Sequence, residues 1–303
     1  MNLQTVTIGA GAAGFNFLPI FIAQRDGLFE KNGVAVEVKR TGSTEAATAA
    51  LLAGQLDLAI TPPEGAIANY INGGPLRIIG GNLNALPLSL IANPRFKRIE
   101  DLRGASLGTS SLTEGTAIYT REILSRHGLR YPGDYEFSMV GIHTARWEAL
   151  QKGTLDAALQ LIPLNFVAED AGYKNLAEAH HYIPEIAFIS IIVDLRWAEN
   201  HEDLLSATLR GIREGVERFY DVRNDDRMLM LLAEVIKADP QYIRRSLDLV
   251  RGKNMVPRNL AIPSAALKTS IKLMRAAGLL NLGEEANPAG ALDDRFISLA
   301  LAQ

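Results

Sequence analysis

Hydrophobic residues recur at every second position in four short stretches of the first hundred residues, and helical spacing separates these stretches. The strand candidates are 3–8, 34–39, 56–60 and 76–80. Between them, 18–30 and 45–52 have the apolar density of helices that cover a sheet. The resulting order β, α, β, α, β, α, β predicts an α/β domain.

A helix, a glycine and a buried strand at 46–60 occur a second time at 145–159. The segments AATAALLAGQLDLAI and ARWEALQKGTLDAAL align without a gap at an offset of 153 − 54 = 99. The identical pairs are Ala46/Ala145, Ala50/Ala149, Leu51/Leu150, Gly54/Gly153, Leu56/Leu155, Asp57/Asp156 and Ala59/Ala158. A repeated supersecondary unit predicts two lobes of similar α/β construction.

The second copy requires the chain to leave the first lobe and return to it. We expect the outward crossing in 87–94 and the return in 185–200, and two extended crossings would form a hinge. Helices are expected to follow and to pack on the first lobe, at 202–220, from an N-cap at Asp239-Pro240, and at 263–277. The predicted lobes, with a ligand cleft between them, are lobe one, 1–90 plus 196–303, and lobe two, 91–195.

Composition supports two domains and excludes several classes of protein. At roughly 100 to 200 residues per domain, 303 residues that are 48% hydrophobic predict about two domains, each with its own core. The net charge of -3 and the lack of a basic block argue against nucleic-acid binding. The absence of cysteine excludes disulfides, thiolate metal sites and cysteine nucleophiles.

The first residues show neither a signal peptide nor a transmembrane helix. No Lys or Arg precedes Arg25, and the apolar run 17–23 contains Pro19 and is too short to cross a bilayer. An exported protein whose leader had been removed would begin in this way, and so would a cytosolic protein. Both the periplasm and the cytoplasm therefore stay open at this point.

The stretch TIGAGAAG at 7–14 has the spacing G-x-G-x-x-G of a dinucleotide-binding turn. Such a turn requires an acidic residue about 20 residues further on, at the end of the second strand. Here that strand ends in Lys39 and Arg40. An NAD(P)-dependent oxidoreductase is therefore kept only as an alternative.

Ligands of open α/β sheets bind beyond the carboxyl ends of the strands, where helices begin. This rule selects, in lobe one, Phe15, Asn16, Thr41, Gly42, Ser43, Thr61, Pro62 and Glu64. In lobe two it selects Ser110, Ser111, Thr113, His143, Arg146 and Gln160. The hydroxyl groups and Arg146 suit an anionic head group, although ordinary helix capping also explains Ser and Thr at these positions. Glu64 and Glu114 would instead favour an amine or a pyrimidine, so the charge of the head group stays open.

The histidines do not form a metal-binding pattern. His180 and His181 are adjacent, and the others lie far apart with no H-x-x-x-H spacing. We therefore expect no metal site and no other cofactor.

The order of these features resembles the type 2 periplasmic binding proteins, in the branch of the sulfonate, nitrate, taurine and thiamine-precursor binders of ABC transporters. The segments that carry the resemblance are 17–38, 49–60, 72–81, 99–129, 149–159 and the segment around Trp197. The resemblance implies two lobes that close by hinge bending around a small-molecule ligand and present it to a membrane permease. It implies no catalysis, and we expect a monomer.

Two alternatives share this fold. One is a cytosolic enzyme; the desulfinase and pyrimidine-synthase types resemble proteins that rely on cysteine, which leaves a decarboxylase that uses Arg, His and Glu. The other is a ligand sensor that works without a transporter.

Overall fold

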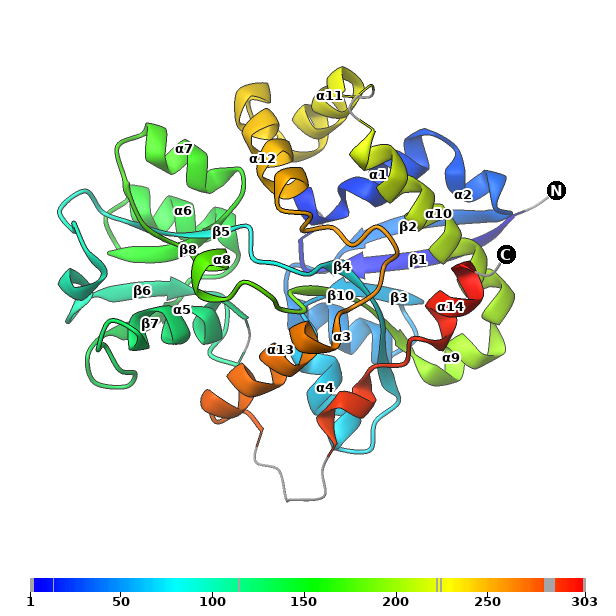
Figure 1. Ribbon diagram of the computed structural model, residues 1–303, viewed down its shortest axis with the longest axis horizontal. Coiled ribbons are helices and arrows are strands. Elements are labelled where there is room, and N and C mark those ends of the chain that lie inside the picture. Colours follow the sequence, from blue (N-terminus) through cyan, green and yellow to red (C-terminus); the bar gives the residue numbers. More distant parts are fainter. Residues whose placement is uncertain are drawn as a thin grey trace.

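The protein consists of two five-stranded sheets that lie side by side, each covered by helices (Figure 1). The computed structural model describes residues 3–12, 14–113, 115–221, 223, 225–280 and 287–301. The first sheet has the order β2-β1-β3-β10-β4 and contains β1 (Gln4–Ala10), β2 (Val34–Arg40), β3 (Leu58–Thr61), β4 (Leu76–Leu83) and β10 (Ile189–Asp194). The second has the order β7-β6-β8-β5-β9 and contains β5 (Leu88–Ala92), β6 (Ser106–Thr109), β7 (Glu136–Met139), β8 (Ala157–Leu161) and β9 (Lys174–Glu178). The predicted α/β fold of two similar lobes is confirmed, and each lobe is named below by its sheet.

Helices connect the strands within each lobe. The first lobe has η1 (Phe15–Phe17), α1 (Leu18–Arg25), α2 (Leu28–Lys31), α3 (Thr44–Leu52) and α4 (Glu64–Ile71). The second has η2 (Ile99–Leu102), α5 (Gly115–Ser125), α6 (His143–Gln151), α7 (Leu164–Asp170) and α8 (Ala179–Tyr182). The predicted helix at 18–30 is divided in two because Gly27 adopts the left-handed conformation, with φ of 66°.

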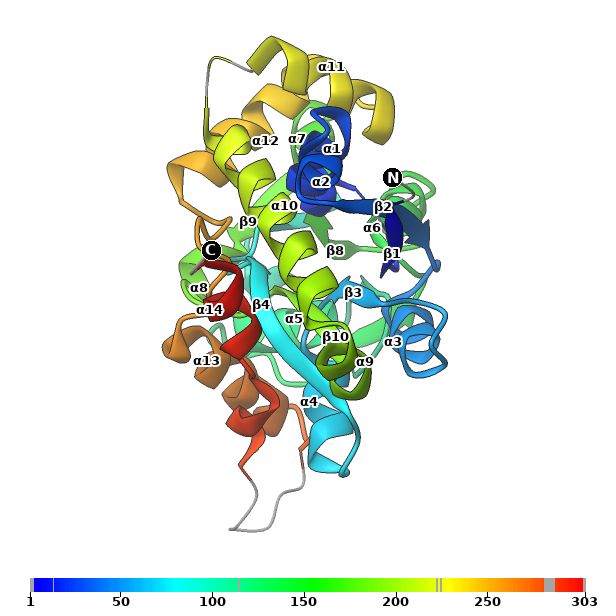
Figure 2. The same ribbon diagram turned by 90° about the vertical axis from the view of Figure 1, so that its right-hand side faces the viewer.

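The rest of the chain is helical after β10. The elements are α9 (Leu195–Asn200), α10 (Glu202–Tyr220), α11 (Asp225–Ile236), α12 (Pro240–Gly252), α13 (Ser264–Ala276), η4 (Pro288–Ala291) and α14 (Arg295–Leu301). The side chain of Asp239 caps α12 by accepting a hydrogen bond from the backbone N–H of Gln241, as the sequence predicts. Figure 2 shows α10 lying across the first lobe beside α1.

The internal repeat has the same hydrogen bonds in both lobes. The Asp57 carboxylate accepts from the backbone N–H of Thr7 at 2.7 Å, and the Asp156 carboxylate accepts from that of Ser106 at 3.0 Å. Gly54 and Gly153 end the preceding helices with φ of 68° and 69°. Both matches fall at the offset of the sequence alignment, so the repeat seen in the sequence is a repeat of structure.

Two extended connections, 84–87 and 183–188, join the lobes. By sheet membership β5 already belongs to the second lobe from Leu88, and β10 belongs to the first lobe from Ile189. These transitions lie a few residues ahead of the predicted ones at 90 and 195, and the division of the chain into two lobes at those residues stays a prediction. The backbone N–H of Phe188 donates to the carbonyl of Leu83 at 3.1 Å, so the two connections lie side by side.

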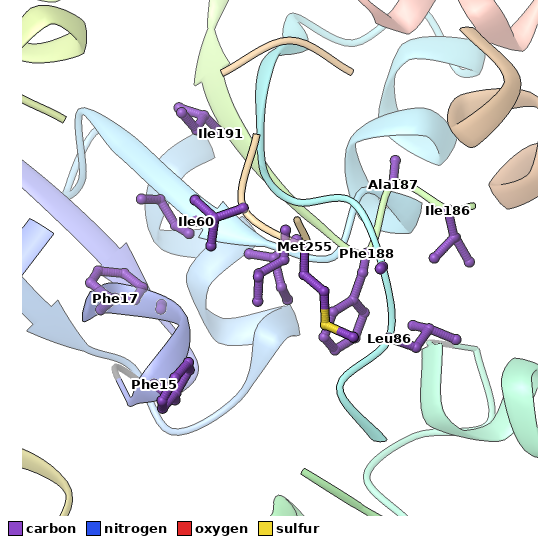
Figure 3. Packing of buried hydrophobic residues seen from close by; sticks show 14 of the residues in the cluster. Phe15, Phe17, Ile60, Leu86, Ile186, Ala187, Phe188, Ile191 and Met255 are labelled. Atoms are coloured by element: carbon purple, nitrogen blue, oxygen red, sulfur yellow. The ribbon is translucent and has the colours of Figure 1, made fainter. Parts of the chain in front are cut away.

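One hydrophobic cluster runs through both lobes and the two connections. It includes Leu58 in the first sheet and Leu159 in the second. Leu86 and Phe188 of the two connections belong to the same cluster, and so does Met255 beside Phe188 (Figure 3). The expectation of a separate core in each lobe is therefore wrong, because the apolar crossing residues connect the two interiors. A smaller cluster around Trp147 lies on the other face of the second sheet.

The helices after β10 contact both lobes, whereas the sequence predicted packing on the first lobe. Arg245 of α12 forms ion pairs with Glu169 at 3.1 Å and Asp170 at 3.2 Å, at the end of α7. The Arg121 guanidinium of α5 donates to the carbonyl of Ala277, after α13, at 3.3 Å. The C-terminal helices thus bridge the lobes on the outside of the hinge.

Replacement of Asp57 or Asp156 by alanine should destabilise the protein by a similar amount, because each change removes a charged acceptor from a partly buried backbone N–H group. The expected loss is about 1–3 kcal/mol in the free energy of unfolding, measured by urea denaturation. The exposed Gln55 lies two residues before Asp57, and Gln55→Ala serves as the control, with a change within about 0.5 kcal/mol. A loss at Asp57 or Asp156 no larger than the control would contradict this account of the repeat.

Candidate ligand-binding site

A cavity of about 120 Å³ lies between the two lobes, beside the second crossing. The first lobe contributes Ala10, Gly11, Ala12, Asn16, Thr44, Ile60, Thr61 and Pro62. The second contributes Leu88, Ser110, Gly115, Thr116, Ile142, His143, Arg146 and Leu161, and Phe188 and Ile189 come from the crossing and the start of β10. This volume holds about four water molecules, or a small organic molecule.

Helix N-termini surround the cavity because parallel strands end there. Thr44, Gly115 and His143 are the first residues of α3, α5 and α6, and all three line the cavity. Unpaired N–H groups and the helix dipole place partial positive charge at such ends. The backbone therefore favours a negatively charged ligand in this position.

The glycines of TIGAGAAG allow close packing at one wall of this cavity. A Cβ atom on Gly9 would lie 2.2 Å from a methyl group of Leu56, and a Cβ atom on Gly11 would lie 2.7 Å from the backbone of Ser43. In the second lobe, a Cβ atom on Gly108 would likewise lie 2.4 Å from a methyl group of Leu155. In addition, β10 runs antiparallel between β3 and β4, unlike the strands of a dinucleotide-binding sheet. Packing thus explains Gly9 and Gly11, whereas a Cβ atom on Gly14 would meet no atom closer than 3.9 Å. The oxidoreductase alternative gains no support.

Arg146 brings a buried positive charge to the cavity. Its side chain is 3% exposed, and its guanidinium donates from Nε to the carbonyl of Leu159 at 3.1 Å and from Nη1 to the carbonyl of Gly141 at 3.0 Å. Among the described residues, no carboxylate lies within ion-pair distance of it. Burial lowers the pKa of Arg146 to about 10, so the group still carries its charge at neutral pH. A buried charge without a counter-ion is unfavourable, and a bound anion would relieve that penalty.

His143 lies next to this charge and is neutral at pH 7. Burial, and to a smaller degree the charge of Arg146, lowers the pKa of His143 to about 4. A neutral imidazole offers one N–H donor and one acceptor to the cavity. Among the described residues that line the cavity, Arg146 is thus the one positively charged side chain, and the polar His143 beside it is uncharged.

Gln160 of β8 holds the first turn of α6 by two hydrogen bonds to its backbone. In the orientation that satisfies both ends of its amide, the nitrogen donates to the carbonyl of His143 and the oxygen accepts from the backbone N–H of Trp147, both at 3.1 Å. Gln160 is fully buried and does not line the cavity. It contacts the backbone of the helix that carries His143 and Arg146.

Six of the residues selected from the sequence line the cavity, and the others do not. The six are Asn16, Thr61, Pro62, Ser110, His143 and Arg146. The others are Phe15, Thr41, Gly42, Ser43, Glu64, Ser111, Thr113 and Gln160, and Glu114 lies outside the described residues. The assignment of all of them to ligand binding stays a prediction.

The residues away from the cavity have structural contacts that explain their positions. Phe15 is buried in the core of the first lobe. The Ser43 hydroxyl caps α3 by accepting from the N–H of Ala46, and Thr41 donates to the carbonyl of Ala10 at 3.0 Å. The hydroxyls of Ser111 and Thr113 bond each other at 2.9 Å. These polar groups are already satisfied within their own loops.

Sequence reasoning did not select the apolar part of the lining. Leu88 and Ile189 are the first residues of β5 and β10, and Phe188 ends the second connection. The apolar residues carry no signal in the sequence, because they look like ordinary strand residues.

The described residues contain no group of three or more His, Asp or Glu side chains that could hold a metal ion. Within the same part of the chain, no helix is both long enough and apolar enough to cross a bilayer.

The model of the NMT1/THI5 like family matches residues 14–222, which is more than half of the chain. The fold, with two lobes around a cavity, is that of the periplasmic binding proteins, and the chain belongs to the NMT1/THI5-like family within it. No curated protein matches the sequence closely enough to be recognised as a relative.

Solved structures of this fold superimpose on nearly the whole chain. The periplasmic nitrate-binding protein NrtA of Synechocystis PCC 6803 has a TM-score of 0.84 at 14% identity, covering 99% of this chain and 89% of its own. The ligand-binding component of an ABC-type import system of Staphylococcus aureus, with zinc bound, has a TM-score of 0.81 at 13% identity, covering 98% and 99%. The alkanesulfonate-binding protein SsuA of Xanthomonas axonopodis pv. citri, bound to MOPS, has a TM-score of 0.74 at 16% identity, covering 96% and 99%.

The NMR signals of the His143 imidazole should not titrate between pH 8 and about pH 5.5, because burial and Arg146 hold its pKa near 4. Arg146→Gln should raise the pKa of His143 while leaving it below 6.5, since burial is the larger cause. Lys152→Gln, at the exposed end of the same helix, should leave this pKa unchanged. Titration of His143 near its ordinary pKa in the unmodified protein would contradict the described burial.

Proposed function

We propose that this protein is the solute-binding component of an ABC import system, and that it captures a small anion between its two lobes and delivers it to a membrane permease. The observation that carries the proposal is the buried Arg146 guanidinium, which lines the cavity and has backbone carbonyls as its partners instead of a carboxylate. A monovalent anion would supply the missing counter-charge.

The other residues that line the cavity also suit a small organic anion. The N-termini of α3, α5 and α6 add partial positive charge, and Asn16, Thr61, Ser110 and Thr116 add hydrogen-bonding groups. Ile60, Leu88, Ile142, Leu161 and Phe188 provide apolar contacts. Glu64, whose carboxylate would favour an amine ligand, does not line this cavity. We therefore infer a ligand with one anionic head group and a short apolar part, such as a carboxylate or sulfonate.

The relatives of similar fold support this role. Nitrate and alkanesulfonates, which two of them bind, are small anions. By analogy with these periplasmic proteins we propose a monomeric protein of the periplasm or another extracytoplasmic space, without catalytic activity and without nucleic-acid partners. The proposed lobes are 1–90 plus 196–303 and 91–195, closing by hinge bending at the two connections.

Arg146→Gln should weaken anion binding by about 2–4 kcal/mol, or roughly 30- to 1000-fold, because it removes the charge that the ligand compensates. The measurement is isothermal titration calorimetry with nitrate and a series of short alkanesulfonates and carboxylates. The free energy of unfolding of the ligand-free protein should stay within about 1 kcal/mol, since an unpaired buried charge is removed together with its hydrogen bonds.

Lys152→Gln is the matched control, because Lys152 caps the same helix and its side chain is 70% exposed. It should leave binding unchanged. Binding of anions with equal affinity by the Arg146→Gln variant, or binding of amines alone by the unmodified protein, would overturn the proposal.

A further inference from the structure

A buried carboxyl group joins the two lobes away from the solute cavity. Glu64 is the first residue of α4 in the first lobe and is 4% exposed. The Tyr119 hydroxyl, on α5 in the second lobe, donates to Oε1 of Glu64 at 3.3 Å, and Tyr119 is 1% exposed. Unlike the ion pairs of Arg245, this contact between lobes is fully buried.

Among the described residues beside Glu64, none carries a positive charge that would balance a carboxylate. Its Oε2 has no hydrogen-bond partner in the described part of the chain. The neighbouring side chains come from α3, α13 and the loop before α5, and include Thr48, Met274 and Thr113. Among these described neighbours the other titratable group is Glu45, which is exposed and also acidic. An ionised Glu64 would therefore be unfavourable in this position.

Tyr119 links this contact to the wall of the solute cavity. Its ring packs edge-on against Phe188, with the ring centres 6.0 Å apart, and Phe188 lines the cavity at the second crossing. The ring also covers Gly115, where a Cβ atom would lie 2.9 Å from it, and Gly115 lines the cavity as the first residue of α5. The position of Tyr119 therefore affects two of the cavity walls.

We propose that Glu64 and Tyr119 form a latch that holds the lobes together, and that the latch closes only when the Glu64 carboxyl group carries a proton. Both are positioning residues: they act on solute capture through closure and do not touch the solute. The inference rests on the hinge closure in the proposed function, and it is independent of the chemistry of the solute.

The protonation of Glu64 changes when the lobes separate. In the open form water reaches Glu64, which then ionises near its ordinary pKa of 4.5; burial in the closed form raises the pKa to about 7. Closure between these values converts the carboxylate to the acid by taking up one proton from the solvent. Because the pKa is raised in the closed form, closure is favoured at low pH and weakens as the pH rises toward 7.

The test uses the protein without solute, so that failure of anion capture does not affect it. The chain contains no cysteine, and spin labels can be attached through Gln55→Cys in the first lobe and Lys152→Cys in the second, both at exposed positions. Double electron–electron resonance then reports the distance between the lobes from pH 4.5 to pH 8. The ratio of closed to open protein should fall by up to about tenfold per pH unit between about pH 5 and pH 7.

Three variants in this labelled background separate the latch from general effects of pH. Glu64→Gln keeps the shape and the acceptor of the neutral acid, and its closed fraction should not change with pH. Glu45→Gln is the matched control at the exposed acidic neighbour, and it should behave like the unmodified protein. Tyr119→Phe should reduce the closed fraction at low pH, where the latch is formed, and far-UV circular dichroism checks that each variant is folded.

A distance distribution that does not change with pH, or that changes equally in the Glu64→Gln variant, would overturn the latch. Retention of the full closed fraction at low pH by the Tyr119→Phe variant would overturn the role of Tyr119. Solute binding measured in parallel by calorimetry distinguishes these outcomes from failure of the proposed anion capture.

Discussion

The structure depends on the two crossings of the chain between its sheets. The first strand after each crossing joins the new sheet in an antiparallel direction: β5 in the second lobe and β10 in the first. Both are the fourth of five strands in their sheets, so each has a neighbour on both sides. Neither lobe can therefore form its sheet without the segment that connects it to the other. The crossings also carry Leu88, Phe188 and Ile189 to the cavity. Leu88 and Ile189 thus belong both to the sheets and to the cavity lining, and Phe188 belongs both to a connection and to the lining.

The sequence predicted most of the fold because its strongest signals are local. Apolar alternation predicted β1 to β4 within about three residues of their observed ends, and helical periodicity gave α10 with the observed bounds. The structural repeat was predicted correctly because Asp57 and Asp156 occupy equivalent positions, and each carboxylate accepts a hydrogen bond from the backbone of a neighbouring strand. The shared core was missed, because contacts of Leu86 and Met255 between lobes leave no periodic pattern.

The site was only partly accessible from the sequence. The rule on carboxyl ends of strands selected Arg146 and His143, but it cannot tell which of several hydroxyls in a loop face inward. Ser111 and Thr113 bond each other, and that pairing depends on the loop conformation. Glu64 at the start of a helix has the local pattern of a residue that complements the dipole. Its contact with Tyr119, 55 residues away, exists only in the folded chain.

The backbone partners of Arg146 have a further consequence for selectivity. Carbonyl groups hold the guanidinium, and no carboxylate in the described part of the chain pairs with it. An anion captured as proposed would therefore displace no internal carboxylate, and Arg146 is the positive side chain that it would meet among the described lining residues. A monoanion leaves the enclosed site neutral, whereas a dianion such as sulfate leaves it with excess negative charge and loses a much larger hydration energy on entry. Anion capture as proposed would therefore discriminate by valence and by the free energy of dehydration, in addition to shape.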